Sequence, residues 1–299
     1  MVIVSMDMSH FSALLAGPNS NMQNGQPSGH ANLFDDIPCQ ASNHINSLLY
    51  ASPDDEEILE AVKSLNSESA PGLDGIPKSF YIASWDRVKE DLSNAIQDII
   101  RGGHLPRVAC VTTMVLIPKF KNPSSINQFR PISMCNFPYK VLATALNRWL
   151  ALYLPLWISM EHHDFVKGRT IQGAIGLAQE MVHDLNVKVS GSNIILKIDT
   201  EKAYDTLEWN FIIKLLRCMG LSSWSIDLLF RCFSSPWFSI SFMGTNCGFF
   251  KSVRGLRPGD PLSPSLFIMS QDSLSHLIKK SISVGGIFPY HCRSAFNRI

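Results

Sequence analysis

The sequence predicts an α+β fold, and three observations support this class. Short β-rich runs are mixed with amphipathic helical patterns, and the two do not alternate as regular βαβ units. Of the 299 residues, 45% are hydrophobic, which is enough for one large or two modest domains with a substantial core. Only 17% are charged, which argues against a disordered or coiled-coil chain.

The N-terminal part is expected to change from linker to helix. Much of residues 1–50 is rich in Gly, Asn, Ser and Pro without periodicity, which is typical of a flexible linker. Ser52, as a capping serine before Pro53 and several acids, predicts the start of a helix over 53–66. A second helix is expected over 86–101, where a pair of glycines ends it.

The middle of the chain alternates between strand and helix patterns. A β-rich run over 114–119 breaks at a proline, as a strand does when it enters a loop. Helices are expected over 138–153 and 171–187. The apolar run 193–198 predicts a buried strand that ends at Asp199.

Helical periodicity continues towards the C-terminus. Helices are expected over 208–219, with Gly220 at the end, and over 223–233. Two β-rich runs around Gly244-Thr245-Asn246 predict a hairpin of strands 238–243 and 247–253. A long helix over 263–280 follows the loop 255–261.

Net charge conceals a strong asymmetry along the chain. The total is +1, but residues 1–100 carry 4 basic and 14 acidic side chains. Residues 101–150 carry 7 basic and no acidic side chains, and residues 251–299 carry 7 basic and 2 acidic ones. Two basic blocks could bind a polyanion, although solvated surface charge explains them equally well on this pattern alone.

Cysteine usage and hydropathy predict the cellular setting. The seven cysteines form no C-x-x-C pair and have no zinc spacing, so they are expected to be free thiols in a reducing compartment. We find no signal-peptide pattern and no apolar stretch of bilayer length, so no membrane partner is expected. The protein is therefore expected to be intracellular, in the nucleus or cytoplasm, and not secreted.

Two segments contain residues suited to chemistry. A carboxylate at the end of a buried strand, as predicted for Asp199, is costly unless it is paired, and Mg²⁺ with its oxygen ligands is one such partner. The alternative is a capping or turn aspartate, which is the role expected for Asp205 at the helix 208–219. The loop 254–264 contains glycines that permit close approach of a ligand and arginines that could meet phosphates. Taken alone, this loop is also consistent with an ordinary turn.

Six segments in order resemble the reverse transcriptase of LINE-type (non-LTR) retrotransposons, with wording closest to the plant elements. They are SAPGLDG at 69–75, LIPK at 116–119, FRPIS at 129–133, FVKGR at 165–169, KIDTEKAYD at 197–205 and RGLRPGDPLSP at 254–264. Any single segment is weak, but the six in the family's order are specific. The resemblance covers roughly residues 50–299.

The resemblance implies a right-hand polymerase fold with a fingers-like region over 51–170, a partial palm over 171–299 and no thumb. It implies RNA-directed DNA synthesis on an RNA template, with a DNA primer and deoxynucleoside triphosphates. Nucleotidyl transfer would use two Mg²⁺ (or Mn²⁺) ions that stabilise the attacking and leaving oxygens. The oligomeric state remains open.

The resemblance also assigns roles to individual residues near the reacting groups. Asp199 corresponds to the first metal-binding, catalytic aspartate, and the main-chain oxygen of Thr200 would help to hold the second metal. Tyr204 would lie under the incoming sugar, where a ring can exclude a 2′-hydroxyl; an ordinary core position is the alternative. Lys119 and Arg130 would grip the triphosphate through charge-assisted hydrogen bonds.

Further contacts are implied on the nucleic-acid side. Gly259 and Ser263 would line the nucleotide and template side of the palm. Phe165 and Arg169 would shape the primer–template path, although a purely structural role is nearly as well supported. Nucleic-acid contacts are also expected for Arg254 and Arg257.

Two departures from the family bear on activity. Pro258 stands where the family has glutamine, so a side-chain amide that could position nucleotide or template is replaced by a residue without an N–H group. The family's next segment, an aromatic–x–Asp–Asp hairpin with the remaining metal-binding aspartate, does not occur before Ile299. The Asp-Asp pair at 35–36 lies in a polar linker before the fingers, and the pair at 54–55 is a helix cap, so neither can replace it. The chain is therefore expected to be truncated and inactive by itself as a polymerase.

Two alternatives remain beside this interpretation. The chain could be a non-enzymatic nucleic-acid-binding remnant of such an element, which shares the fold and differs only in catalysis. It could instead be a phosphotransfer enzyme with Asp199 as nucleophile, but that chemistry favours a second aspartate two residues later, where this chain has Glu201.

Overall fold

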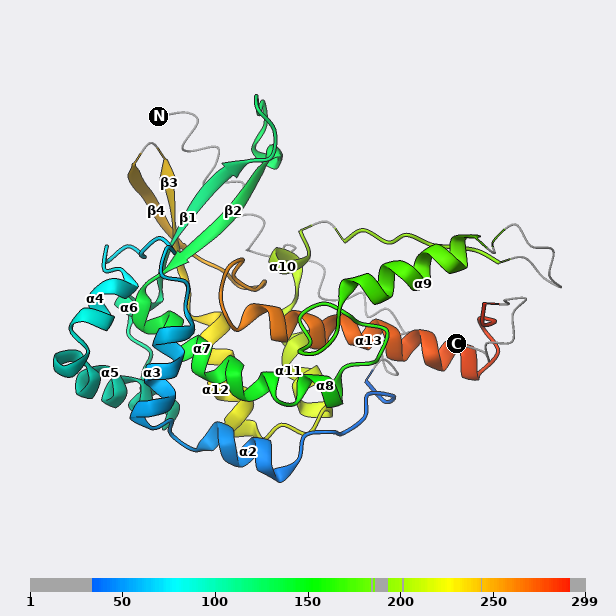
Figure 1. Ribbon diagram of the computed structural model, residues 1–299, viewed down its shortest axis with the longest axis horizontal. Coiled ribbons are helices and arrows are strands. Elements are labelled where there is room, and N and C mark those ends of the chain that lie inside the picture. Colours follow the sequence, from blue (N-terminus) through cyan, green and yellow to red (C-terminus); the bar gives the residue numbers. More distant parts are fainter. Residues whose placement is uncertain (1–33, 184, 186–192, 201, 243, 291–299) are drawn as a thin grey trace, which may run out of the picture.

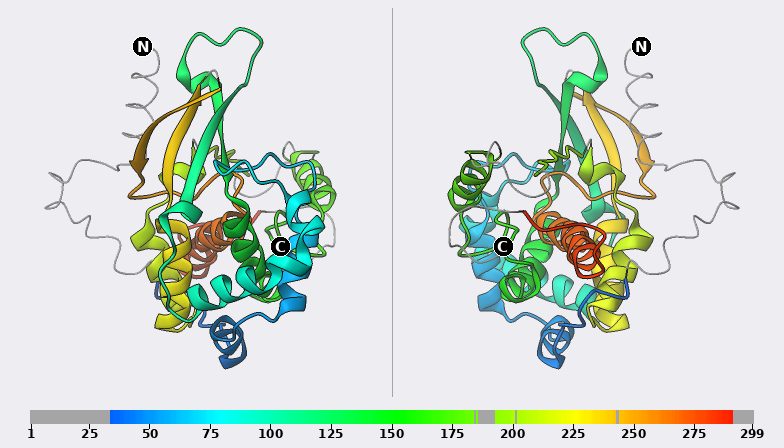
Figure 2. Two further views of the ribbon diagram at one scale, coloured as in Figure 1. Left: turned by 90° about the vertical axis from the view of Figure 1, so that its left-hand side faces the viewer. Right: turned by 90° about the vertical axis from the view of Figure 1, so that its right-hand side faces the viewer.

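The computed structural model describes residues 34–183, 185, 193–200, 202–242 and 244–290 (Figure 1). A small sheet projects from a larger helical body, and the long helix α13 runs through that body (Figures 1 and 2). The helices are α2 Asn43–Tyr50, α3 Asp55–Ser64, α4 Lys78–Ala83, α5 Trp85–Ile100, α6 Arg107–Cys110, α7 Phe137–Ala151, α8 Leu154–Trp157, α9 Ile171–His183, α10 Ala203–Thr206, α11 Trp209–Cys218, α12 Ser223–Ser234 and α13 Ser263–Ser283, with the 3₁₀ helix η3 Ile126–Gln128. The strands are β1 Val111–Pro118, β2 Phe129–Cys135, β3 Trp237–Phe242 and β4 Thr245–Lys251.

The four strands form one mixed sheet in the order β2-β1-β3-β4. β1 pairs antiparallel with β2 and parallel with β3, while β3 and β4 form the predicted antiparallel hairpin. A small apolar cluster of Met114, Phe238 and Ile240 covers one part of the sheet. Together with the helical body, this sheet confirms the predicted α+β class.

The main core lies around α7, which is buried on most of its sides. α7 contacts α3, α2, α5 and α13, so the N-terminal helices and the C-terminal half of the chain share one hydrophobic core. Tyr139, Leu142 and Leu146 are among its fully buried side chains. The helix predicted over 138–153 is therefore confirmed, and its position is central.

The other predicted helices are also present, with small shifts at their ends. The predictions 86–101, 208–219, 223–233 and 263–280 correspond to α5, α11, α12 and α13. The helix predicted over 171–187 is α9, which ends at His183. In the described part of the chain, we find no helix that is long and apolar enough to cross a membrane.

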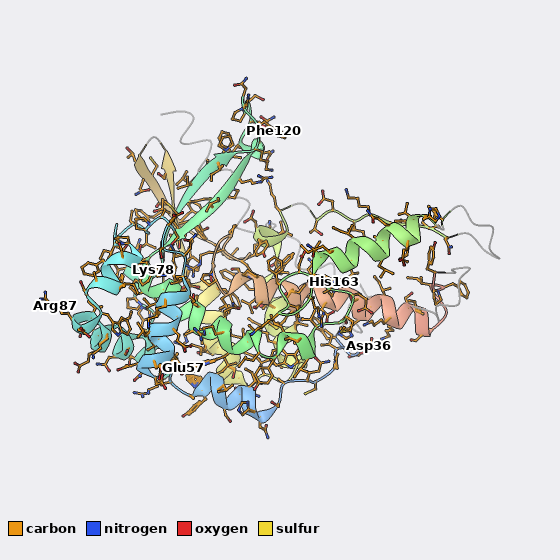
Figure 3. All side chains as sticks on the ribbon, in the orientation of Figure 1. Asp36, Glu57, Lys78, Arg87, Phe120 and His163 are labelled. Atoms are coloured by element: carbon orange, nitrogen blue, oxygen red, sulfur yellow. The ribbon has the colours of Figure 1, made fainter. Side chains whose placement is uncertain are left out.

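The helix predicted over 53–66 is α3, which is capped by Asp54 rather than by Ser52. Asp54 accepts a hydrogen bond from the Glu57 main-chain N–H at 2.8 Å, and its own N–H donates to Glu57 Oε2 at 3.2 Å. This reciprocal pair is a capping box, which needs a Glu or Gln side chain three residues after the cap. At the other end of α3, the buried Lys78 donates to the main-chain oxygens of Lys63 and Leu65, which the helix end leaves without partners (Figure 3).

Residues 34–50 correct the prediction of a linker over 1–50; residues 1–33 lie outside the described residues. α2 buries Ile45 and Leu49 completely against the main core. Asn46 Oδ1 accepts hydrogen bonds from the main chain of Ser222 at 2.8 Å and from the Ser225 hydroxyl at 3.1 Å. These contacts come from α12, distant in sequence, so a composition-based reading of this polar segment could not detect them.

The prediction of a buried strand over 193–198 is wrong. Its residues belong to no strand, and Ile194, Leu196 and Ile198 are 76%, 81% and 71% exposed. A strand needs a neighbour to pair its main-chain groups, and none of the four described strands pairs with this segment. Asp199 is therefore exposed, and it does not lie at the end of a buried strand.

Candidate functional site

The segment after Asp199 and the loop 254–262, which carry separate sequence motifs, meet in the structure. The main-chain N–H of Leu256 donates to the oxygen of Tyr204 at 2.7 Å, and that of Gly255 donates to the oxygen of Leu207 at 2.8 Å. The indole N–H of Trp209 donates to the Gly255 oxygen at 2.8 Å. The segment after Asp199 and the loop 254–262 are thus joined through their main chains.

Gly255 is the point of closest approach in this junction. It has a φ of 85°, which favours glycine, and a Cβ placed there would lie 2.6 Å from the main-chain oxygen of Asp205. No larger residue fits without moving one of the two segments. The glycine is therefore required by tertiary contact as well as by its turn.

Tyr204 is held firmly beside this junction. Its ring stacks on Phe267 of α13, with centroids 4.5 Å apart and an interplanar angle of 15°. Burial raises the pKa of the Tyr204 hydroxyl, so the group stays neutral near pH 7. The ring packs partly against the main core, and its predicted role beneath a sugar remains a prediction.

Asp205 does not cap the helix predicted over 208–219. It lies in the short helix α10, whereas the residue before α11 is Glu208, which makes no side-chain capping bond. Burial raises the pKa of Asp205 to about 6, and the nearby Lys202 lowers it only in part. Asp205 is half-buried, and Gly255 packs against its main chain.

The loop 254–262 also reaches the sheet. The Ser133 N–H on β2 donates to the Pro258 main-chain oxygen at 3.2 Å. Gly259 follows with a φ of 87° and is exposed, as its predicted role requires. Pro258 thus anchors the loop through its carbonyl group, a function that proline retains although it lacks an N–H.

Arg257 is an internal residue, and this contradicts the predicted nucleic-acid contact. It is 2% exposed, and its guanidinium donates to the main-chain oxygen of Cys232 at 2.8 Å and to Thr112 Oγ1 at 3.2 Å. Burial alone would lower the pKa of Arg257, but the electrostatic effects of Tyr139, Cys135 and Asp260 raise it. The charge is therefore kept inside the protein and used to hold the loop.

Asp260 is the acidic partner of Arg257 in this interior network. Its Oδ2 lies 3.3 Å from Arg257 Nε, as an ion pair without hydrogen-bond geometry, and accepts a hydrogen bond from the Tyr139 hydroxyl at 2.6 Å. Its Oδ1 accepts from the Leu262 N–H at 2.9 Å, immediately before α13. Ser263, the first residue of α13, is 3% exposed, so its enclosed side chain does not agree with the predicted place on the nucleotide side.

Arg169 and Phe165 behave differently from each other. Arg169 donates to four main-chain oxygens, those of Pro155, Ile158, Ser159 and His162, at 2.6–3.2 Å. These bonds favour the structural role that the sequence left open. Phe165 is exposed and has a φ of 59°, an uncommon conformation for a residue other than glycine, so its predicted role in the nucleic-acid path remains a prediction.

Lys119 and Arg130 are exposed next to the connection between β1 and β2. This connection carries Phe120 (Figure 3). Lys119 Nζ donates to the Asn127 main-chain oxygen at 3.0 Å, and Lys202 Nζ donates to Asn127 Oδ1 at 3.2 Å. This contact joins the hairpin to the segment after Asp199. The pairing of Asn127 with Lys202 is not apparent from the sequence, because nothing in their local pattern shows that they meet.

The side chain of Arg254 is less accessible to nucleic acid than the sequence suggests. Its guanidinium forms an ion pair with Glu208 at 3.3 Å, and its side chain is 17% exposed. The predicted nucleic-acid contact would have to compete with this carboxylate. It remains a prediction.

The described residues do not form a complete site for two divalent ions. Asp199 and Thr200 are both exposed, but we find no group of three or more His, Cys, Asp or Glu side chains in the described part of the chain that could hold a metal. Mg²⁺ requires near-octahedral oxygen ligands, usually including one or two carboxylates. Asp199 can therefore supply one ligand, and the remainder of such a site is not among these residues.

Comparison with known proteins places this geometry in context. Residues 117–291 match the reverse transcriptase (RNA-dependent DNA polymerase) family. The chain is 25% identical over 228 residues to the transposon TX1 uncharacterized 149 kDa protein of Xenopus laevis, and the match covers 76% of this chain and 17% of that protein.

Two further relatives are Pol polyproteins of R2 retrotransposable elements. The chain is 23% identical over 249 residues to the type-1 R2 protein of Nasonia vitripennis, and 29% identical over 221 residues to the type-2 R2DM protein of Drosophila melanogaster. These matches cover 79% and 72% of this chain. Across the three relatives, the chain spans only 17% to 23% of the relative's length.

Proposed function

Because the chain belongs to the reverse transcriptase (RNA-dependent DNA polymerase) family, we propose that it takes part in RNA-directed DNA synthesis as the reverse transcriptase domain of a LINE-type (non-LTR) retrotransposon. Domains of this family in general bind an RNA template, a primer and deoxynucleoside triphosphates, and they depend on divalent metal ions. We propose the same partners for this chain, with a DNA primer and with Mg²⁺ or Mn²⁺. The retrotransposon names of the relatives support the type of element.

One observation carries the proposal. Three segments that resemble the family meet through main-chain hydrogen bonds: β2 at Ser133, the segment after Asp199 at Tyr204, and the loop 254–262 at Leu256 and Pro258. Segments that are far apart in sequence and meet at one place are expected where several of them build a common site. Their convergence therefore favours a shared functional site. Unrelated turns and helices would not be expected to meet in this way.

We assign the proposed regions as the sequence predicts them. The fingers-like region over 51–170 contains the projecting β1–β2 hairpin, and the partial palm over 171–299 contains Asp199 and Tyr204. The two regions share a sheet, because β1 pairs with β3. The contact at Asn127 joins Lys119 to Lys202, in the segment that follows Asp199.

The exposed residues of this assembly have distinct proposed roles. Asp199 supplies one ligand to a divalent ion, and Thr200 supplies a main-chain oxygen beside it. Lys119 and Arg130 neutralise the triphosphate, and their charges come from a block without acidic residues. The stacked ring of Tyr204 limits the space beside the sugar.

We further propose that these 299 residues bind nucleic acid but do not polymerise by themselves. Two-metal transfer needs more carboxylates than Asp199 provides, and the described residues contain no cluster that completes the set. Full activity would require a further carboxylate from sequence outside these residues. A non-enzymatic nucleic-acid-binding remnant is the second candidate, and the incomplete metal site is the observation that favours it.

Primer extension on an RNA template, with Mg²⁺ or Mn²⁺, tests the lack of polymerisation. The purified chain is expected to add no nucleotides. Robust incorporation that Asp199→Ala abolishes would contradict this part of the proposal. The exposed Asp227, in an ion pair on α12, provides a matched control as Asp227→Ala.

Salt-dependent binding tests the nucleic-acid part. The affinity for a primer–template duplex is expected to fall steeply with added salt, because bound phosphates release counterions. Lys119→Ala and Arg130→Ala should each weaken binding, whereas Lys214→Ala, an exposed lysine on α11, should not. An affinity that changes neither with added salt nor with the two substitutions would refute this proposal.

A further inference from the structure

The connection between α8 and α9, residues 158–170, lies against α13 (Figure 1). The buried Asp272 of α13 makes the central contact. Its Oδ1 accepts the Ser159 main-chain N–H at 3.1 Å and lies 3.3 Å from His162 Nε2. The same His162 nitrogen lies 3.0 Å from the Ser275 hydroxyl, about one turn further along α13. The carboxylate therefore attaches the start of this connection to the helix.

A second contact follows on the same side of α13. Lys279 Nζ donates to the Ser159 hydroxyl at 3.0 Å and to Glu161 Oε2 at 3.1 Å. Asp272, Ser275 and Lys279 are spaced at i, i+3 and i+7, so they lie on one face of the helix. The pair of Lys279 and Glu161 is about half exposed and contributes less than the buried carboxylate.

The rest of the connection is closed on itself. Arg169 donates to four main-chain oxygens of the segment 155–162, and its own main-chain N–H donates to the Val166 oxygen at 3.2 Å. Val166 is buried in the main core, and Phe165 directly precedes it. Phe165 has a φ of 59° and an exposed side chain. Such conformations persist only where the surroundings hold them, so the exposed ring is presented from a fixed backbone.

The surroundings of the Phe165 ring are suited to an unpaired base. Residues between 163 and 172 line an open hollow of about 610 Å³ around it. Every base has a π-face that can stack on an aromatic ring, and the exposed Lys167 can meet a phosphate nearby. Because the exposed Asp164 also lines this hollow, the charges largely offset each other, and the ring is the group that carries the contact.

From this arrangement, we propose that Asp272 is the positioning residue of Phe165, and that it holds the ring where an unpaired base of the nucleic acid stacks on it. The inference rests on the proposed function. Asp272 acts without touching the ligand, because it is buried on α13 and reaches the loop through Ser159 and His162. None of the six segments that resemble the family contains Asp272.

The test is the affinity for a single-stranded RNA oligonucleotide, measured by fluorescence anisotropy on the purified chain. Phe165→Ala is expected to weaken binding about fivefold or more, because the stacking of one base is lost. Asp272→Ala should weaken it by a similar factor. The double variant should bind within about twofold of Phe165→Ala, since Asp272 has no ring left to position. Losses that multiply in the double variant, or an unchanged affinity of Asp272→Ala, would overturn the inference.

Asp272→Asn separates position from stability. The asparagine side-chain oxygen can still accept the Ser159 N–H, so this variant should regain most of the affinity that Asp272→Ala loses. A variant that binds as weakly as Asp272→Ala would contradict the link through Ser159.

Ile96→Ala is the matched control for lost stability, because Ile96 is buried in α5, away from the loop (Figure 1). It should lower the free energy of unfolding and leave the affinity unchanged. If Ile96→Ala weakens binding as much as Asp272→Ala does, the affinity follows stability alone and the inference fails.

Hydrogen exchange without nucleic acid checks the link independently. The main-chain amides of residues 159–169 should exchange faster in Asp272→Ala than in the unchanged protein or in Ile96→Ala, and equal rates would overturn the inference. An oligonucleotide that does not bind the unchanged protein refutes the proposed function. Binding that depends on neither Phe165 nor Asp272 refutes only the inference, so the two failures are distinguishable.

Discussion

The guanidinium of Arg257 lies 3.8 Å from the centre of the Tyr139 ring, and it donates to the main-chain oxygen of Cys232. The contact connects the loop 254–262 to α7 and α12 in the interior of the protein. A basic residue that the sequence places among phosphate contacts is thus an internal anchor. The exposed part of the loop is held in place by this buried part.

Arg257→Ala is expected to destabilise the protein by about 3–5 kcal/mol, because it leaves the buried Asp260 without its cation. Urea denaturation at pH 7 measures the change. Arg254→Ala is the control, since its ion pair with Glu208 is partly exposed and should contribute less than about 1 kcal/mol. Equal losses for the two variants would contradict the internal role of Arg257.

Gly255→Ala is expected to cost about 1–3 kcal/mol, because the new Cβ meets the Asp205 main-chain oxygen and the φ of 85° strains the residue. Gly285→Ala separates the two causes, because Gly285 has a φ of 76° but open space around its Cβ position. Thermal unfolding compares the variants. A smaller effect at Gly255 than at Gly285 would argue against the close contact.

Asp272 is expected to stabilise the protein at neutral pH. His162 and His276 lie 3.3 and 3.2 Å from its carboxylate, and the Ser159 N–H donates to it at 3.1 Å. Burial acts to raise the pKa of Asp272, but hydrogen bonds from His162 and Ser159 and the charge of His276 outweigh it, so the pKa is lowered. The resulting stability is present above the usual value of 3.8 and is lost as the pH falls through the lower folded value.

Asp272→Asn should therefore reduce the free energy of unfolding at pH 7 by about 1–3 kcal/mol. The difference from the unchanged protein should shrink below pH 3.8. Urea titrations at pH 7 and pH 3 measure both effects. Asp227→Asn is the control, because Asp227 forms an exposed pair with Arg231 and its substitution should change stability little at either pH. If Asp272→Asn lowers the free energy of unfolding equally at both pH values, the lowered pKa of Asp272 does not account for the stability.

Asp205 is expected to stabilise the protein at low pH and to destabilise it as the pH rises, which is opposite to the effect of Asp272. Because burial raises its pKa to about 6, the folded protein binds this proton more tightly than the unfolded chain. The stability that this group contributes is complete below pH 3.8 and is lost as the pH rises through about 6. Asp205→Asn, which cannot ionise, should be more stable than the unchanged protein at pH 8, by on the order of 2 kcal/mol.

Unfolding at pH 4 and pH 8 measures this difference, which should be close to zero at the lower pH. Asp199→Asn is the control, since its carboxyl group is exposed. A lower stability of Asp205→Asn at pH 8 would show instead that the ionised carboxylate makes a favourable contact.

Much of the helical framework could be predicted from local sequence. α5, α7, α11 and α12 follow apolar periodicity, and Gly220, with a φ of 94°, follows the C-cap of α11 as expected. The family was also predictable, because ordered motifs identify it, and the match over residues 117–291 confirms it. The β3–β4 hairpin follows from two β-rich runs around a turn.

The segment 193–198 shows why other predictions were wrong. Its apolar residues fit a strand, but strand formation depends on a partner elsewhere, and no described strand pairs with it. α2 shows the converse case, because a short polar segment becomes a helix when Ile45 and Leu49 find the main core. Both outcomes depend on surfaces that the local residues do not contain.

The sequence by itself therefore determined the periodic elements, the family and the residue types available for phosphate and metal chemistry. Only the tertiary structure decided which charges are available. Arg257 and Arg169 donate their hydrogen bonds within the protein, whereas the side chains of Lys119 and Arg130 are exposed. The physical reason is that the burial and pairing of a charged side chain depend on residues from other helices and strands. The spacing of residues in the sequence does not show which of these elements come into contact.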